Sequence, residues 1–118
     1  MGNSKTGTIR TFESGATRDT DEGKLDYEGF LSPLVVERYA QYMHKHRMQS
    51  DGRLRASDNW QRGIDTTAYI KSLYRHFLDL QLHHRGYSEL AREPKQEALC
   101  AIIFNAMGML YESLKESL

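Results

Sequence analysis

Three stretches of the chain repeat apolar residues at intervals of three and four, the spacing that places side chains on one face of a helix. The first helix is predicted over 32–48, because Ser32 is a good N-cap and Pro33 suits the first helical position. The same spacing predicts a second helix over 66–85 and a third over 95–116.

The remaining segments lack such periodicity. Residues 1–29 are predicted to form an irregular arm, and a polar loop joins the first two helices. Gly86 is a natural stop for the second helix. Because no alternating strand pattern is bounded by turn residues, we expect a single all-α domain over 1–118, a small bundle of three main helices.

Composition narrows the class of protein. The 118 residues carry 16 Lys and Arg against 16 Asp and Glu, so the formal charge is zero, which argues against a protein that binds the phosphate backbone of nucleic acid. The single cysteine, Cys100, allows no intrachain disulfide. No signal peptide and no apolar stretch long enough for a membrane span is recognised, so we expect a cytoplasmic protein without membrane partners.

The second predicted helix carries a narrow polar stripe on an otherwise apolar surface. At about 100° per residue, Ser72, His76, Asp79 and His83 fall within roughly 40° of one another. The rest of the helix is too apolar for an ordinary surface helix. The third predicted helix repeats the pattern with Glu97, Ala101, Asn105, Gly108 and Glu112.

Two such stripes placed face to face would form a polar cleft inside an apolar shell. Asp79 and Glu97 would supply the oxygen ligands that Mg²⁺ or Mn²⁺ selects, with His76 as a further ligand. The alternative is that each stripe is a solvated helix face. Whether Glu37, His83 or Glu112 joins the site is left open.

The loop before the second helix holds chemistry suited to a nucleotide. Arg53, Arg55 and Arg62 offer guanidinium groups for phosphate oxygens, and Trp60, next to Asn59, offers an indole for stacking on a base. Trp60 is equally suited to cover the core. We find no G-x-S-x-G, HExxH or GxGxxG motif, and Cys100 lies in an apolar run typical of an inert core thiol.

The order of short motifs resembles a family. It runs SGATRD, EGK, DNWQRGI, SLYRH, and then a Glu eight residues before an Asn in an apolar helix. This order is similar to the mostly phage-encoded dATP/dGTP diphosphohydrolases, which are grouped with the MazG-like all-α nucleotide pyrophosphohydrolases. The EExxE and ExxD motifs of well-studied MazG-like enzymes are absent, and Glu97-Ala98 and Phe104 replace an Asp-His pair and a Trp of the family pattern.

The resemblance implies a Mg²⁺-dependent hydrolase that converts purine deoxynucleoside triphosphates to monophosphate and pyrophosphate. Its catalytic residues would be His76, Asp79 and Glu97, with all three near the metal and His76 as ligand or general base. The residues expected to bind nucleotide are Arg18, Lys24, Asn59, Trp60, Arg75 and Asn105.

Two alternatives belong to other classes of protein. The first is a non-catalytic protein that sequesters a purine nucleotide or a cyclic nucleotide signal, and the second is a helical interaction module. In every case the apolar surface of the second and third helices is wider than three helices can cover, so we expect a homodimer or homotetramer. If phage-encoded, the protein would act in the host cytoplasm.

Overall fold

The computed structural model describes residues 8–20 and 22–118, and three long helices dominate them: α2 (Pro33–Lys45), α3 (Thr66–His84) and α4 (Lys95–Glu116). The predicted all-α class is therefore confirmed, with one small sheet in addition. Residues 1–7 of the predicted arm, and residue 21, lie outside the described part.

The helices begin and end where local chemistry dictates. The Ser32 hydroxyl accepts a hydrogen bond from the Val35 amide (3.3 Å), so the predicted N-cap is present, and the Asp65 carboxylate caps α3 by accepting one from the Thr67 amide (3.2 Å). Gly86 has a φ of 87°, a left-handed conformation that ends α3. Only the end of α2, at Lys45, falls short of the predicted residue 48.

The chain divides into two compact units, 1–35 and 36–118, which we call the N-terminal unit and the helical unit. In the N-terminal unit, β1 (Ile9–Thr11) pairs antiparallel with β2 (Thr17–Asp19), and α1 (Tyr27–Phe30) follows. The segment predicted to be irregular thus contains a short hairpin, whose turn includes Gly15 at a φ of 92°.

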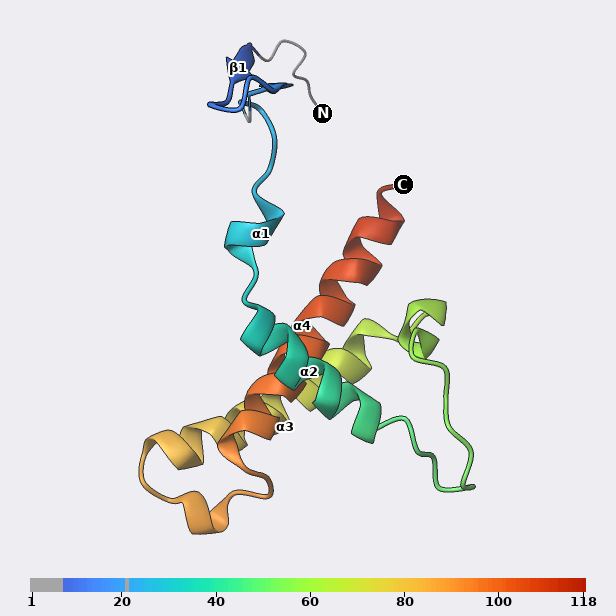
Figure 1. Ribbon diagram of the computed structural model, residues 1–118. Helices are drawn as coiled ribbons and strands as arrows, with labels where there is room; N and C mark the ends of the chain where they lie inside the picture. The colour runs from blue at the N-terminus through green and yellow to red at the C-terminus, as the bar shows by residue number, and fades with distance from the viewer. Residues whose placement is uncertain (1–7, 21) are drawn as a thin grey trace. The chain divides into compact units, whose positions relative to one another are not determined.

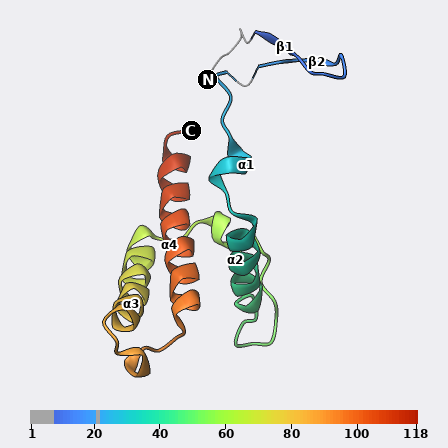
Figure 2. The same ribbon diagram turned by 60° about the vertical axis from the view of Figure 1, so that its left-hand side comes forward.

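In the helical unit α3 and α4 run antiparallel side by side (Figures 1 and 2). The Tyr69 ring lies against Gly108, and the Asn105 amide donates to the Ser72 hydroxyl (3.2 Å), so the two predicted polar stripes do face one another. Tyr42 of α2 packs on Cys100 and its neighbours in α4. Two short 3₁₀ helices, η1 (Asn59–Arg62) and η2 (Ser88–Leu90), complete the unit.

Among the described helices, α4 is long and apolar enough to cross a membrane by length and composition. This corrects the expectation that no stretch reaches such a length. A core helix of a soluble protein passes the same test, and in this structure Asn105 and Gly108 on one side of α4 are buried against α3.

Candidate functional site

A cavity of about 420 Å³ opens in the helical unit between α2, η1 and the α3–α4 pair. Five of the residues selected from the sequence as candidate ligands line it: Arg55, Asn59, Trp60, His76 and Asn105. They come from three segments that are distant in the sequence. The cavity is large enough to hold part of a nucleotide-sized ligand, since ligand cavities commonly measure about 300–1,000 Å³.

Trp60 forms one aromatic wall of this cavity. Its ring meets Phe104 edge-on at 6.3 Å and Tyr111 at 5.1 Å between centroids, both from α4. These contacts hold the indole in place while it remains partly exposed. Trp60 therefore covers part of the core and faces the cavity as well, so the two roles expected for it are compatible.

Two arginines reach the cavity from the loop that follows α2. The Arg47 Nε donates to the Arg55 carbonyl (2.9 Å), and the Arg55 amide donates to the Arg47 carbonyl (2.9 Å). These two hydrogen bonds, one from the Arg47 side chain and one between backbones, close a hairpin-like loop in which Met48 faces Leu54. Both arginines line the cavity and bring positive charge to its wall.

The contact line between α3 and α4 is unusually polar for a helix interface. Asp79 and Asn105 are only 1% and 2% exposed. The Asn105 amide also donates to the Ala101 carbonyl (2.8 Å), so its burial is compensated by hydrogen bonds. Gly108 continues the line. A Cβ at this position would stand 2.2 Å from the Tyr69 ring, so glycine permits this close contact between α3 and α4.

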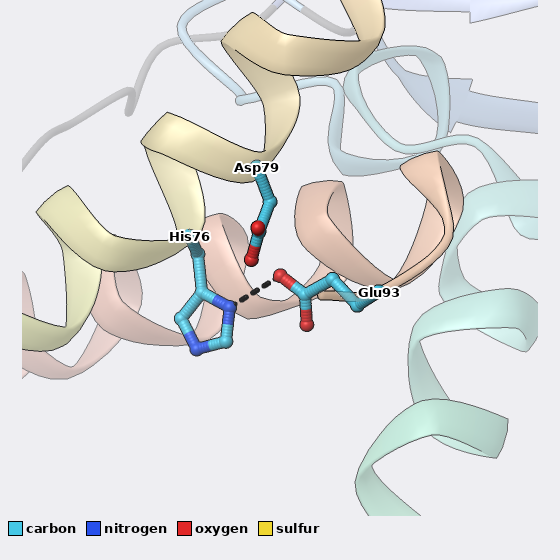
Figure 3. Close-up of side chains that lie close together, drawn as sticks. All are labelled: His76, Asp79 and Glu93. Carbon is cyan, nitrogen blue, oxygen red and sulfur yellow. Dashed lines mark hydrogen bonds and ion pairs between the residues drawn. The ribbon is translucent and has the colours of Figure 1, made fainter. Parts of the chain in front are cut away.

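One end of this line holds a compact cluster of His76, Asp79 and Glu93 (Figure 3). One ligand atom from each of the three lies within 4.8 Å of the others. His76 and Asp79 come from consecutive turns of α3, whereas Glu93 comes from the loop before α4. The His76 Nδ1 and a Glu93 carboxylate oxygen are 2.5 Å apart, and Nε2 is the nitrogen that this contact leaves available.

Arg92 neutralises the buried Asp79. Its guanidinium donates to both carboxylate oxygens, at 3.1 Å and 2.7 Å to Oδ2 and 3.3 Å to Oδ1, and its backbone amide donates to Oδ1 at 3.0 Å. The side-chain hydrogen bond from Arg92 is the main reason that the pKa of Asp79 falls to about 2. Asp79 is therefore ionised at neutral pH although it is buried.

His83 fixes the loop that supplies Glu93. One ring nitrogen bonds the Ser88 hydroxyl (2.8 Å) and the other bonds the Glu93 carbonyl (2.7 Å). Both nitrogens are thus engaged within the protein. In the structure His83 acts on the site through the position of Glu93.

Glu97, expected beside Asp79, lies in a different environment. It pairs with Lys45 and lies 4.0 Å from Arg38, and the hydrogen bond from Lys45 is the main cause that lowers its pKa. Glu97 therefore joins α4 to α2 in this structure and is not part of the three-residue cluster.

The cavity wall also carries Tyr42 and His46, whose ring centroids are 4.4 Å apart with the planes tilted by 50°. Burial raises the pKa of Tyr42 to about 12, with Glu93 and Glu97 contributing, so its hydroxyl stays protonated and can donate a hydrogen bond. Burial, followed by the charge of Lys45, lowers the pKa of His46 and favours the neutral ring.

The remaining residues predicted to bind nucleotide are Arg75, Arg18 and Lys24. The side chain of Arg75 is exposed, and its carbonyl accepts a hydrogen bond from Arg92 (2.8 Å). Arg18, in β2, and Lys24 belong to the N-terminal unit and are exposed. Glu112 accepts a hydrogen bond from the Ile64 amide (3.3 Å) and pairs with Lys115.

Three site residues were missed by the sequence analysis: Arg47, Arg92 and Glu93. All three lie in loops next to a helix end, where helical-wheel reasoning does not apply. The available signal was the charged pair directly before Pro94, because residues in front of a helix N-terminus fold back over the neighbouring helix when the connection is short.

Comparison with known proteins identifies no relative of this chain. No family model, curated protein or solved structure significantly matches the chain. The fold and the site define a mostly helical protein with a cavity lined by apolar and polar side chains and a partly buried cluster of His76, Asp79 and Glu93 that meets the cavity at His76.

Proposed function

We propose that the protein is a divalent-metal-dependent nucleoside triphosphate pyrophosphohydrolase acting on purine deoxynucleotides in the cytoplasm. The observation that carries this proposal is the meeting of the acidic cluster with the cavity at His76, which belongs to both. The resemblance to the dATP/dGTP diphosphohydrolases supports it, since Asn59, Trp60 and His76 from the similar motifs line the same cavity.

The donor chemistry fits a divalent cation. Mg²⁺ is commonly held by one or two carboxylates together with substrate phosphates, and Mn²⁺ accepts the same ligands. Asp79 and Glu93 would hold the ion, and Arg92, whose side chain is 55% exposed, would release one Asp79 oxygen. When bound, the ion would offset the negative charge of the phosphoryl oxygens.

His76 is the residue best placed to accept a proton. With Nδ1 held by Glu93, Nε2 would take the proton of the attacking water. The water oxygen would form a bond to the α-phosphorus while the bond from that phosphorus to the bridging oxygen breaks. The electron pair leaves with pyrophosphate, and the monophosphate is the second product.

The opposite wall would hold the rest of the substrate. Arg47 and Arg55 would neutralise the β- and γ-phosphates through charge-assisted hydrogen bonds. Trp60 offers a ring face for the base, and Asn59 offers an amide for hydrogen bonding to base or sugar. The roles of the other residues expected to bind nucleotide or metal stay predictions; these are Arg18, Lys24, Arg75, Asn105 and Glu97.

The proposal is tested by incubating the full chain with each of the common nucleoside and deoxynucleoside triphosphates, with Mg²⁺, with Mn²⁺ and with a chelator. We expect monophosphate and pyrophosphate in equal amounts, with dATP or dGTP as the best substrate and no product in the chelator. Release of inorganic phosphate in place of pyrophosphate would contradict the proposed bond cleavage.

A second candidate is a nucleotide-binding protein without turnover. Arg92 favours it, because its guanidinium already balances the charge of Asp79 without a metal ion. This candidate predicts that a purine nucleotide or cyclic nucleotide raises the melting temperature in the presence of a chelator and is recovered unchanged. If the protein only binds nucleotide, Arg92→Gln should lower its stability, because Asp79 loses its partner. If the protein is a metal-dependent hydrolase, the same variant should leave Asp79 free to bind the cation.

A further inference from the structure

The part of the cavity wall formed by the end of α2 and the loop that follows it is rich in hydrogen-bond donors. We call four of its side chains the donor wall: Tyr42, His46, Arg47 and Arg55. None of the described residues that line the cavity is an aspartate or a glutamate. A surface that offers donors and positive charge without carboxylates suits an anionic ligand.

The Tyr42 hydroxyl is a donor without a partner. Only 8% of Tyr42 is exposed, and its hydroxyl makes no hydrogen bond to any residue that the structure describes. Among the described side chains, the Tyr69 hydroxyl alone is both fully enclosed and unpartnered, so the Tyr42 hydroxyl keeps contact with the cavity. Since polar groups of buried side chains normally have a partner, the free hydroxyl points to a ligand that supplies one.

The other three side chains of the donor wall also have unused donors. Neither ring nitrogen of His46 has a partner in the described part of the chain. The Arg47 Nε donates to the Arg55 carbonyl, which holds the guanidinium in place. Both terminal nitrogens of Arg47 and the whole guanidinium of Arg55 make no hydrogen bond to a described residue. The donor wall is therefore positioned for a ligand rich in acceptors.

The carboxylates nearest to the donor wall are bound elsewhere. The charges of Glu93 and Glu97 act on Tyr42, but neither carboxylate accepts a hydrogen bond from it. Glu93 contacts His76, and Glu97 pairs with Lys45. Because both acids have partners outside the donor wall, its donors are left for a ligand.

We propose that the donor wall is a pyrophosphate subsite, which binds the two outer phosphates of the triphosphate and, after cleavage, the pyrophosphate product. The part that concerns the triphosphate rests on the proposed function. The subsite adds the Tyr42 hydroxyl and the His46 ring to the contacts of the two arginines. Phosphate oxygens are strong acceptors that guanidinium groups bind in pairs. The donors come from two segments of the chain, so they can surround more than one phosphate group.

The test is a titration of the full chain with inorganic pyrophosphate in the presence of a chelator. The fluorescence of Trp60 reports binding, because Trp60 is the only tryptophan and lines the same cavity. We expect saturable binding that is about tenfold or more tighter than for inorganic phosphate or sulfate, each of which offers a single anionic group. Calorimetry should give the same dissociation constants.

Two variants measure the contribution of the donor wall. Tyr42→Phe keeps the ring and removes the donor, so the dissociation constant for pyrophosphate should rise by about tenfold. Arg55→Gln should raise it by about tenfold or more, because it removes a charged donor. The matched control Tyr39→Phe, one turn earlier on α2 and outside the cavity lining, should bind pyrophosphate as the wild type does. Circular dichroism checks that each variant is folded.

Pyrophosphate that binds no more tightly than sulfate would overturn the proposal, as would a Tyr42→Phe variant with wild-type affinity. Citrate that binds as tightly as pyrophosphate would assign the donor wall to polycarboxylates instead. The titration requires neither turnover nor a metal ion. Binding of pyrophosphate without hydrolysis of any triphosphate would therefore contradict the hydrolase and keep the subsite, whereas hydrolysis without pyrophosphate binding would contradict the subsite alone.

Discussion

The contact line between α3 and α4 and the outward face of α3 have opposite chemistry. The contact line buries Asp79 and Asn105 at 1% and 2% exposure, whereas Phe77 and Ile70, a quarter-turn away on α3, are 50% and 39% exposed. Apolar side chains usually fill a helix interface and polar ones its surface. The burial of polar groups where apolar ones are the rule is what makes the contact line a candidate site.

The burial of Asp79 and Asn105 in the polar line depends on their hydrogen bonds. Burying a carboxylate or an amide costs free energy unless hydrogen bonds replace those to water. Arg92 provides them for Asp79, and Ala101 and Ser72 provide them for Asn105. Retaining such a line requires several specific partners, which is typical of functional sites.

The largest expected effect concerns activity at the polar line. His76→Gln removes the proton acceptor, and the turnover number should fall by about 10²- to 10⁴-fold. His84→Gln, exposed at the end of the same helix, is the matched control and should keep wild-type turnover. Steady-state kinetics measures both. Equal rates for the two variants would show that His76 takes no part in proton transfer.

The next effect concerns packing along the line. Gly108→Ala adds a methyl group 2.2 Å from the Tyr69 ring, so the free energy of unfolding should fall by about 3 kcal/mol despite the better helix propensity of alanine. Urea unfolding measures it. The double variant with Tyr69→Leu should recover most of the loss, and additive effects would contradict the contact.

Acid should remove the stabilisation that Asp79 provides. Because Arg92 lowers the pKa of Asp79 from 3.8 to about 2, the contribution is complete above about pH 5 and is lost as the pH falls through 3.8 toward 2. The expected loss is about 2 kcal/mol. In Asp79→Asn this part of the pH dependence of unfolding should vanish, leaving the smaller slope from Glu97. An unchanged slope would contradict the ion pair.

The smallest effect is expected on the outward face of α3. Ile70→Thr should change the free energy of unfolding by less than about 1 kcal/mol, because Ile70 is already 39% exposed. Urea unfolding measures the change. A loss as large as that of a core substitution, about 2 kcal/mol or more, would contradict the exposure of Ile70.

The three long helices could be predicted because each boundary has a local cause. Ser32 and Asp65 cap their helices and Gly86 ends α3, so neighbouring residues suffice to set these limits. The hairpin of β1 and β2 was missed because each strand has only three residues, too few for an alternating pattern to be recognised.

The site was predictable where its residues lie on helices or carry distinctive chemistry in a loop, as Arg55 and Trp60 do. The facing of Ser72 and Asn105 follows from helical spacing, and the structure brings them together. Glu93 and Arg47 depend on how a loop folds back, which helical spacing does not encode. Glu97 lies on the expected side of α4, but Lys45 of α2 is its partner, and such pairing between helices depends on tertiary packing.

The most direct test of the central claim, that the polar line and its cavity cleave a triphosphate, is a single-turnover reaction with dATP and dGTP in ¹⁸O-labelled water with Mn²⁺. We expect the label in the monophosphate and none in the pyrophosphate, with no product from Glu93→Gln and normal product from the exposed control Glu89→Gln. Intact triphosphate after incubation with the wild-type chain and either metal, or label in the pyrophosphate, would contradict the account.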